Sequence, residues 1–224
     1  MKLKYVLFVI LLGLSTSLFS APTVNGSTGL IIVPTAEALK YKEGNIALDF
    51  LSGQDEDGKS LTEWVYKMNL GTFENWELGV VGGTTPTEGM YLNVKYYLIA
   101  DDSRLPLSIA IGSQNLSSSE STDVYMVASK KFRPDLGVHM GFRAVFSPGD
   151  LDPNFMSGIN FLAKEELEFL ADIDGRQDVY TINIGSRYYF QNNVSMHVYI
   201  LDIGQRIENN TKVAIGITMS KFLL

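Results

Sequence analysis

Several residue types and patterns are missing from this sequence, and each absence narrows the fold. The chain contains no cysteine, which excludes disulfide bonds, thiolate metal sites and a lipid-anchored N-terminal cysteine. After Ala21 it has no apolar run near the roughly 20 residues that a membrane-spanning helix needs. If the mature chain enters a membrane, it must do so as β-strands.

Positive charge is also scarce. The formal net charge is −7, which argues against a nucleic acid or an anionic surface as a partner. No glycine-rich phosphate loop or metal-binding helix motif is present, so we expect neither a cofactor nor a metal ion. The acidic residues suit solvated loops.

The N-terminus has a composition of its own. Lys2 and Lys4 precede an apolar stretch over residues 5–14, and small residues follow up to Ala21. This pattern is typical of a secretory signal peptide, so we predict that residues 1–20 are removed on export, with a retained signal anchor as the alternative. The rest divides into an N-terminal segment, residues 21–44, and one β-domain, residues 45–224.

From Asn45 onward the chain breaks into segments of roughly eight to twelve residues, rich in Val, Ile, Tyr, Phe and Thr and separated by turn residues. Apolar and polar residues alternate within many of them; Ile46, Leu48 and Phe50, for example, alternate with Asn45 and Asp49. We predict an all-β fold, an antiparallel transmembrane β-barrel of about twelve strands. The predicted strands are residues 45–52, 61–71, 76–83, 90–99, 106–114, 123–132, 138–146, 155–163, 166–173, 180–190, 194–202 and 211–223.

The connections show a second regularity, because short and long ones tend to alternate. The short ones, residues 72–75, 101–105, 133–137, 164–165 and 191–193, are predicted to be periplasmic turns. The longer ones, residues 53–60, 84–89, 115–122, 147–154 and 203–210, are predicted to be external loops, with residues 174–179 intermediate in length. An even strand number agrees with this arrangement, because it places both ends of a barrel on the periplasmic side of a bacterial outer membrane.

A soluble, secreted β-sandwich is the alternative fold, since it also has alternating strands. Its outward face should be richly charged, whereas the polar face here carries many Gly, Ala, Ser and Asn residues, which suits a narrow lumen better. Aromatic residues near the strand ends are predicted to form two interfacial girdles; they are Trp64, Trp76, Tyr97, Phe132, Tyr188, Tyr189, Phe190 and Phe222.

A motif precedes the first predicted strand. It comprises Gly29, Leu30 and Ile31, then Pro34, Thr35 and Ala36, and finally Gly44. In these residues the chain resembles the YjbH-like family, whose longer members are several times its size. The resemblance implies an outer-membrane protein, here a short single-barrel form, associated with exopolysaccharide secretion.

The motif also carries a structural prediction of its own. Thr35 can cap a short helical turn over residues 36–41, which Gly44 can terminate. A packing role for these residues is favoured over ligand binding. The segment would then lie against the periplasmic mouth of the barrel or enter the lumen as a plug.

The remaining functional surface is the lumen. The residues predicted to line it are Glu63, Lys67, Asn93, Lys95, Lys131, Arg143, Asn160, Asp172, Asn183 and Arg187. Charges of both signs occur among them, so they would either pair into a filled polar core or line a narrow passive pore. Expected partners are outer-membrane lipid, a polysaccharide or small solutes, and the barrel-assembly machinery during biogenesis.

Three other functions are weaker alternatives. A lipid hydrolase would use Ser195 and His197, which share one face of a strand, and a binding barrel would use the external loops. Calcium sites could involve Asp55, Glu56 and Asp57 or Asp150, Asp152 and Asn154, although solvated loops are favoured for both clusters. We predict that the protein is not an enzyme and has no catalytic residues.

Overall fold

The structure is a computed structural model that describes residues 21–54, 59–84, 89–99, 107–176, 179–190, 193–204 and 211–223. These residues contain twelve β-strands and no helix, and therefore no helical segment with the length and apolarity to cross a membrane. The strands are β1 (Glu43–Gln54), β2 (Ser60–Phe73), β3 (Trp76–Gly83), β4 (Tyr91–Ile99), β5 (Ser108–Gln114), β6 (Thr122–Arg133), β7 (Leu136–Ser147), β8 (Asp150–Lys164), β9 (Leu167–Arg176), β10 (Val179–Tyr189), β11 (Val194–Leu201) and β12 (Lys212–Leu223). The predicted signal peptide, residues 1–20, lies outside the described residues.

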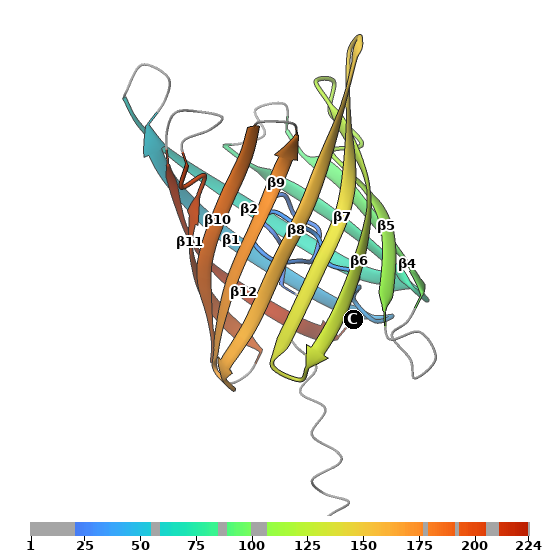
Figure 1. The fold of residues 1–224 in the computed structure, drawn as a ribbon, viewed down its shortest axis with the longest axis vertical. Helices are drawn as coiled ribbons and strands as arrows, with labels where there is room; N and C mark the ends of the chain where they lie inside the picture. Colours follow the sequence, from blue (N-terminus) through green and yellow to red (C-terminus); the bar gives the residue numbers. More distant parts are fainter. Residues whose placement is uncertain are drawn as a thin grey trace, which may run out of the picture.

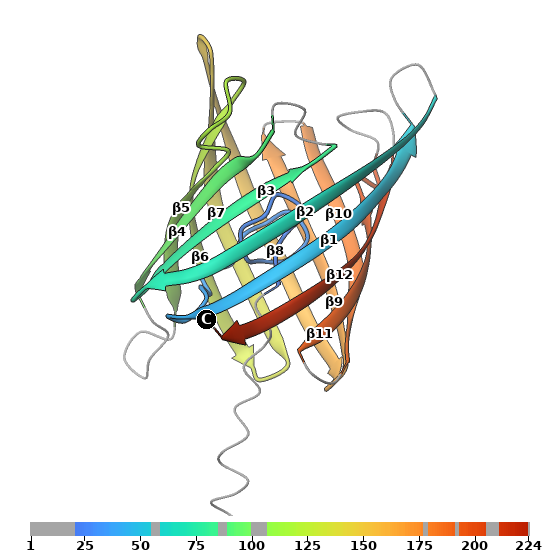
Figure 2. The same ribbon diagram turned by 180° about the vertical axis from the view of Figure 1, so that it is seen from behind.

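The strands form one closed antiparallel barrel in which each strand pairs with its neighbours in sequence and β1 pairs with β12. Glu43 lies opposite Leu223, so the chain enters and leaves the barrel at the same end, as Figures 1 and 2 show. We call this end the terminal mouth and the opposite end the loop mouth. The prediction of an antiparallel barrel of twelve strands is confirmed, and the β-sandwich alternative is wrong.

The alternation along each strand places apolar side chains outside and polar side chains inside. On β1, for example, Ile46 and Phe50 are 46% and 53% exposed, whereas Asn45 and Asp49 are fully buried. A soluble protein would bury the first pair and expose the second. The apolar outer surface with a polar interior is the arrangement of a barrel that faces lipid.

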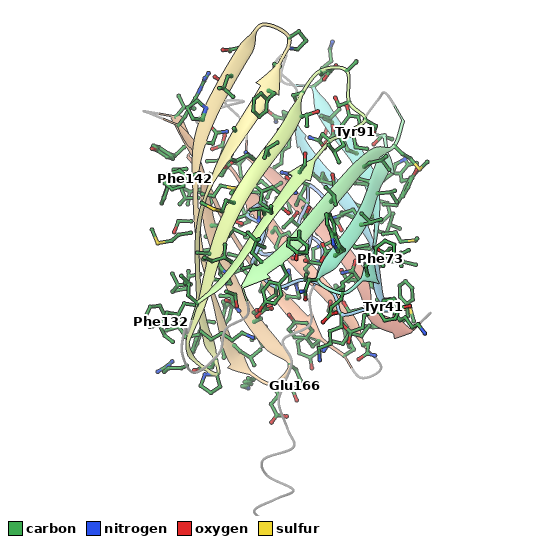
Figure 3. The ribbon with its side chains drawn as sticks, turned by 90° about the vertical axis from the view of Figure 1, so that its right-hand side faces the viewer. Tyr41, Phe73, Tyr91, Phe132, Phe142 and Glu166 are labelled. Atoms are coloured by element: carbon green, nitrogen blue, oxygen red, sulfur yellow. The ribbon has the colours of Figure 1, made fainter. Side chains whose placement is uncertain are left out.

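Aromatic side chains gather on the outside near the terminal mouth. Figure 3 shows Tyr41, Phe73 and Phe132 at this level, with Phe142 and Tyr91 closer to the loop mouth. Trp64, Trp76, Tyr188 and Phe190 are also exposed outside, as the girdle prediction requires. Phe222 packs against Gly44. Tyr97 and Tyr189 do not belong to a girdle, because their side chains hydrogen bond inside the lumen to Ser108 and Glu168.

One predicted external loop is wrong. Residues 147–154 mostly belong to a long hairpin in which Ser147 pairs with Asp150 and β8 begins five residues earlier than predicted. Pro153 obscured this strand because proline cannot donate to a sheet. It is tolerated because β9 begins to pair with β8 only at Phe155, so no neighbour needs its missing N–H. The hairpin rises above the other strands at the loop mouth (Figure 1).

The N-terminal segment runs inside the barrel, where both ribbon views place it (Figures 1 and 2). We call residues 21–40 the plug. Ile31, Val33 and Ala36 of the plug are fully buried, and Leu30 and Leu39 are nearly so. The structure thus decides between the two positions that the sequence left open, in favour of the lumen.

The predicted helical turn over residues 36–41 is wrong, because residues 37–40 are extended and a turn occurs only at Tyr41 and Lys42. The physical reason is competition for backbone N–H groups. In a helix capped at Thr35, the Leu39 N–H would donate to the Thr35 carbonyl. Here the Leu39 N–H donates to Glu77 Oε2, and the Thr35 carbonyl accepts from Lys95 Nζ at 3.3 Å, so the barrel wall takes both groups. Gly44 ends no helix and lies in β1, where an added Cβ would be 2.4 Å from the Phe222 ring.

Candidate functional site

Most of the residues predicted to line the lumen do lie on its wall. Seven of them are at most 5% exposed inside the barrel, namely Lys67, Asn93, Lys95, Asn160, Asp172, Asn183 and Arg187. The Arg143 side chain is 10% exposed and lies close to Asp123 and Asp174. Glu63 is half-buried towards the loop mouth. The Lys131 side chain is 43% exposed and pairs with Glu37 of the plug at 2.6 Å.

Asp172 on β9 holds the centre of the plug. Its Oδ2 accepts hydrogen bonds from three successive backbone N–H groups, those of Ile31, Ile32 and Val33, at 3.0, 2.8 and 3.0 Å. Its Oδ1 accepts a fourth bond, from Asn183 Nδ2 at 2.8 Å. Successive N–H groups that converge on one anion form a compact binding arrangement for negative charge. The carboxylate therefore fixes residues 31–33, in the middle of the plug.

The plug folds tightly at this point, with an isolated bridge between Gly29 and Pro34. A Cβ added to Gly29 would lie 2.4 Å from the carbonyl oxygen of Val33 and 2.7 Å from Pro34 Cα. Both neighbours are backbone, so neither can move cheaply. The glycine and proline of the motif therefore serve close packing within the plug, in line with the packing role predicted for the motif.

Lys95 and Glu77 hold the plug on its other side. Lys95 Nζ donates to the carbonyl oxygens of Thr28 and Glu37 at 2.9 and 2.6 Å, and it lies 3.5 Å from Glu77 Oε2. Glu77 accepts from the Thr28 N–H at 2.9 Å and from the Thr28 hydroxyl at 2.6 Å. This buried ion pair thus also satisfies the polar backbone of the plug.

The beginning of the plug is held by β2 and β4. Lys67 Nζ donates to the Thr23 carbonyl at 2.9 Å and forms a buried ion pair with Asp49. Asn69 donates to the carbonyl of Gly26 at 2.8 Å. Asn93 donates to the carbonyl of residue 25 at 3.0 Å. The wall thus supplies side-chain donors that add to the few backbone hydrogen bonds within the plug.

Arg187 on β10 joins the wall to the plug through a buried network. It donates to Glu168 Oε2 at 3.1 Å, to the Tyr199 hydroxyl at 2.9 Å and to the Leu30 carbonyl at 3.3 Å. The Tyr189 hydroxyl donates to the same Glu168 oxygen at 2.6 Å. Each charge in this network has an opposite charge or several hydrogen bonds, as buried charges require.

Two apolar clusters complete the packing. In the first, Leu30 and Ile31 of the plug contact wall residues that include Val65, Tyr199 and Ala214. In the second, Val33 and Ala36 contact wall residues on β5, β6 and β8, namely Ala110, Tyr125, Val127 and Met156. The plug is therefore packed against the wall by apolar contacts and fastened by polar ones.

A pocket of about 570 Å³ opens at the terminal mouth beneath the plug. Its lining includes Ser129 and His139, which share a hydrogen bond of 2.7 Å between Oγ and Nδ1. His139 Nε2 lies 3.0 Å from Asn160 Oδ1, and Asn160 Nδ2 donates to Glu168 at 2.8 Å. Ser129 Oγ also accepts the N–H of Ala36, so this chain of residues holds the plug as well.

Ser195 and His197, the residues of the hydrolase alternative, do not hydrogen bond to each other as Ser129 and His139 do. Ser195 Oγ has no hydrogen-bond partner, and His197 uses Nε2 to contact Asp49 Oδ1 at 3.1 Å. Among the described residues no group of three His, Asp or Glu side chains is arranged to hold a metal ion. Asp152 of the calcium alternative pairs with Arg176 on β9. Asp55, Glu56 and Asp57 lie outside the described residues.

Sequence reasoning missed several residues that fasten the plug. Asp49, Glu77, Ser129 and Glu168 all point inward and are at most 6% exposed. Each occupies the polar face of its strand, so the alternation that selected Lys67 and Lys95 would have selected them too. Of these four, only Glu77 and Ser129 bond to the plug directly, and the sequence does not indicate these contacts, because the partners are 38 to 93 positions away in the chain.

No family model and no curated protein matches this chain. Among solved structures, its barrel is similar to the NanC porin, with a TM-score of 0.60, 15% identity, and coverage of 79% of this chain and 100% of that one. The KdgM porin gives a TM-score of 0.57 with 14% identity, covering 79% of this chain and 99% of that one. These likenesses show a shared fold.

The Ralstonia pickettii toluene transporter TbuX is similar over a larger part of the chain. Its TM-score is 0.51 at 9% identity, and the match covers 93% of this chain and 100% of that one. The barrel strands span only residues 43–223, so this match also extends over residues that precede β1.

Proposed function

We propose that this chain is a non-enzymatic outer-membrane channel for small polar solutes, and that its own N-terminal plug closes it in the state described here. One observation carries the proposal: charged side chains of the lumen wall bind the backbone of the plug. Lys67, Lys95 and Arg187 donate to its carbonyl oxygens, and Glu77 and Asp172 accept from its N–H groups.

These bonds are of a kind that water can replace. If the plug withdrew, both its backbone and the wall charges would be hydrated, and the wall would become the lining of an aqueous pore. A permanent core would not need charges on the wall, because well-packed apolar residues stabilise an interior at least as well as buried ion pairs do. Twelve strands enclose more space than the eight that side chains alone fill, so the barrel has room for a narrow channel.

An outer-membrane location agrees with the exterior of the barrel. The exposed apolar side chains and the aromatic residues near the terminal mouth match a lipid-facing surface with an interfacial girdle. The fold shared with the two porins supports the same location. The closely spaced turns at the terminal mouth then face the periplasm, which places the plug and the 570 Å³ pocket on that side.

We further propose that the solutes are saccharides connected with envelope polysaccharide. The support is the resemblance to YjbH-like proteins, whose signature corresponds here to the part of the plug that Asp172 holds. One solved KdgM structure is described as a complex with disordered oligogalacturonate, which concerns that porin. Saccharide passage is measured by swelling of liposomes that contain the barrel, with neutral and acidic sugars of increasing size.

Planar-bilayer recording tests the channel itself. The full chain should open rarely, whereas a variant that lacks residues 21–40 should conduct steadily. A second variant replaces these residues with a glycine and serine stretch of equal length, which keeps the tether but removes the contacts, and it should also conduct. Heat-modifiable migration on a gel verifies that each barrel is folded. Folded variants that conduct no more than the full chain would sink the proposal.

The absence of catalysis is tested at Ser129, because its chain of bonds to His139 and Asn160 has the residue types of a serine hydrolase. We expect no ester hydrolysis and no labelling of Ser129 by a fluorophosphonate, since the serine fastens Ala36 of the plug. Ester hydrolysis that disappears in Ser129→Ala would instead make the protein an enzyme.

A further inference from the structure

One part of the lumen wall carries buried side-chain atoms that have no hydrogen-bond partner. The side-chain oxygens of Ser195 on β11 and of Thr218 and Ser220 on β12 have no partner, and neither does Nδ1 of His197. Each of these four side chains is at most 2% exposed. We call them the hydroxyl patch.

The patch is continuous. Ser195 lies directly opposite Thr218 in the pairing of β11 with β12, and His197 and Ser220 are the next inward positions along the two strands. Ser220 is followed by Lys221, which lines the 570 Å³ pocket at the terminal mouth, so the patch begins at the edge of that pocket. At the other end His197 stacks on Tyr199, with ring centroids 4.4 Å apart. Tyr199 belongs to the apolar cluster that includes Leu30 and Ile31 of the plug.

Strands in three other parts of the wall do bind the plug. Asp172 on β9, Glu77 on β3 and Ser129 on β6 all form hydrogen bonds with plug backbone groups. A buried hydroxyl without a partner costs about 1–3 kcal/mol relative to one in water. Separation of the plug from the hydroxyl patch breaks no side-chain hydrogen bond of these four residues, and it hydrates their unpaired atoms. Apolar contacts with Tyr199 and Ala214 still hold the plug to β11 and β12, so we expect opening to begin at the hydroxyl patch, on the side of the terminal mouth.

We propose that the solute path runs between the plug and the hydroxyl patch, and that the patch binds neutral, hydroxyl-rich solutes such as short uncharged saccharides. Serine and threonine hydroxyls both donate and accept, which matches sugar hydroxyl groups, and none of the three carries charge. The stacked rings of His197 and Tyr199 add a flat surface next to them. This inference rests on the proposed channel function and adds its route and its preferred solute.

The chain has no cysteine, so single cysteines can report on the path. Thr218→Cys tests the patch, and Ala110→Cys is the matched control, since both side chains are fully buried in the wall and Ala110 packs on the opposite, fastened side. In the full chain within a planar bilayer, a charged methanethiosulfonate reagent should react at least about tenfold faster with the Thr218 variant and should block its openings. Maltotriose should slow that reaction, and galacturonate at the same concentration should not.

A second variant keeps the inference testable if the cysteine disturbs folding. Thr218→Val preserves shape but removes an unpaired hydroxyl from the closed state, so openings should become about tenfold rarer. Equal reaction and block at Ala110, or unchanged openings in Thr218→Val, would overturn the proposed route. Protection by galacturonate as strong as that by maltotriose would overturn the preference for neutral solutes. The channel function would survive either result, provided that the variant without residues 21–40 conducts, and it would fail if that folded variant did not.

Discussion

Replacing Asp172 by asparagine keeps the size of the side chain but removes the charge that faces three backbone N–H groups. One of the two carboxylate oxygens becomes an NH2 donor, which must point either at the plug or at the Nδ2 of Asn183. Asn183 cannot turn its amide freely, because its Oδ1 accepts the Asp202 N–H at 2.9 Å. In either orientation the new NH2 group faces another N–H donor, and residue 172 is only 3% exposed, so water cannot easily compensate.

The magnitude follows from the bonds lost. A hydrogen bond to a charged group contributes about 1.5–3 kcal/mol, and Asp172 forms three such bonds to the plug. Asparagine can keep part of this set through its own carbonyl oxygen, so we expect the closed state to lose about 3 kcal/mol. Since about 1.4 kcal/mol corresponds to a factor of ten, the ratio of open to closed barrels should rise about 100-fold.

Single-channel recording in planar bilayers measures this ratio as the fraction of time spent open. The matched control is Asp174→Asn, the next inward residue on the same strand, which pairs with Arg143 and accepts no hydrogen bond from the plug. It should leave the open fraction within about threefold of the parent, because the wall rather than the plug loses a contact. A folded Asp172→Asn barrel that opens no more often than the parent, or an equal effect in the control, would refute the assignment of Asp172 as the residue that holds the plug.

Four further substitutions test other parts of the structure. Lys95→Met should raise the open fraction at least as much as Asp172→Asn, because it leaves the buried charge of Glu77 without its cation and removes a donor from the plug carbonyls of Thr28 and Glu37, and bilayer recording measures it. Gly29→Val should also open the barrel, since its side chain meets plug backbone at 2.4 Å, and a protease added at the terminal mouth should then cut residues 21–40. Ile217→Arg on the lipid face should lower the free energy of folding by about 2–4 kcal/mol in urea titrations in lipid, whereas an arginine near a mouth should cost less. Asp152→Asn should change folding by less than about 1 kcal/mol in the same titration, because its partner side chain, that of Arg176, is 48% exposed.

The barrel could be predicted because its rule is local. A strand alternates its side chains between two faces whatever the rest of the chain does, so Ile46 and Phe50 could be separated from Asp49 by position alone. The largest error in a predicted strand boundary is at the start of β8. Pro153 is compatible with this strand only because β9 does not pair with it there. The predicted helical turn after Thr35 is absent because the Leu39 N–H and the Thr35 carbonyl, which a helix would join, find partners on strands far away in the sequence.

The sequence by itself determined the strand period, the strand number, the common end of both termini and the polar character of the lumen, because each follows from spacing along the chain. Only the tertiary structure decided that residues 21–40 occupy the lumen and that the predicted lining residues hold them there. Those contacts join residues up to 158 positions apart, and a lysine that faces inward looks the same in sequence whether it meets water or a backbone carbonyl. The position of the plug in the lumen is therefore a property of the folded chain.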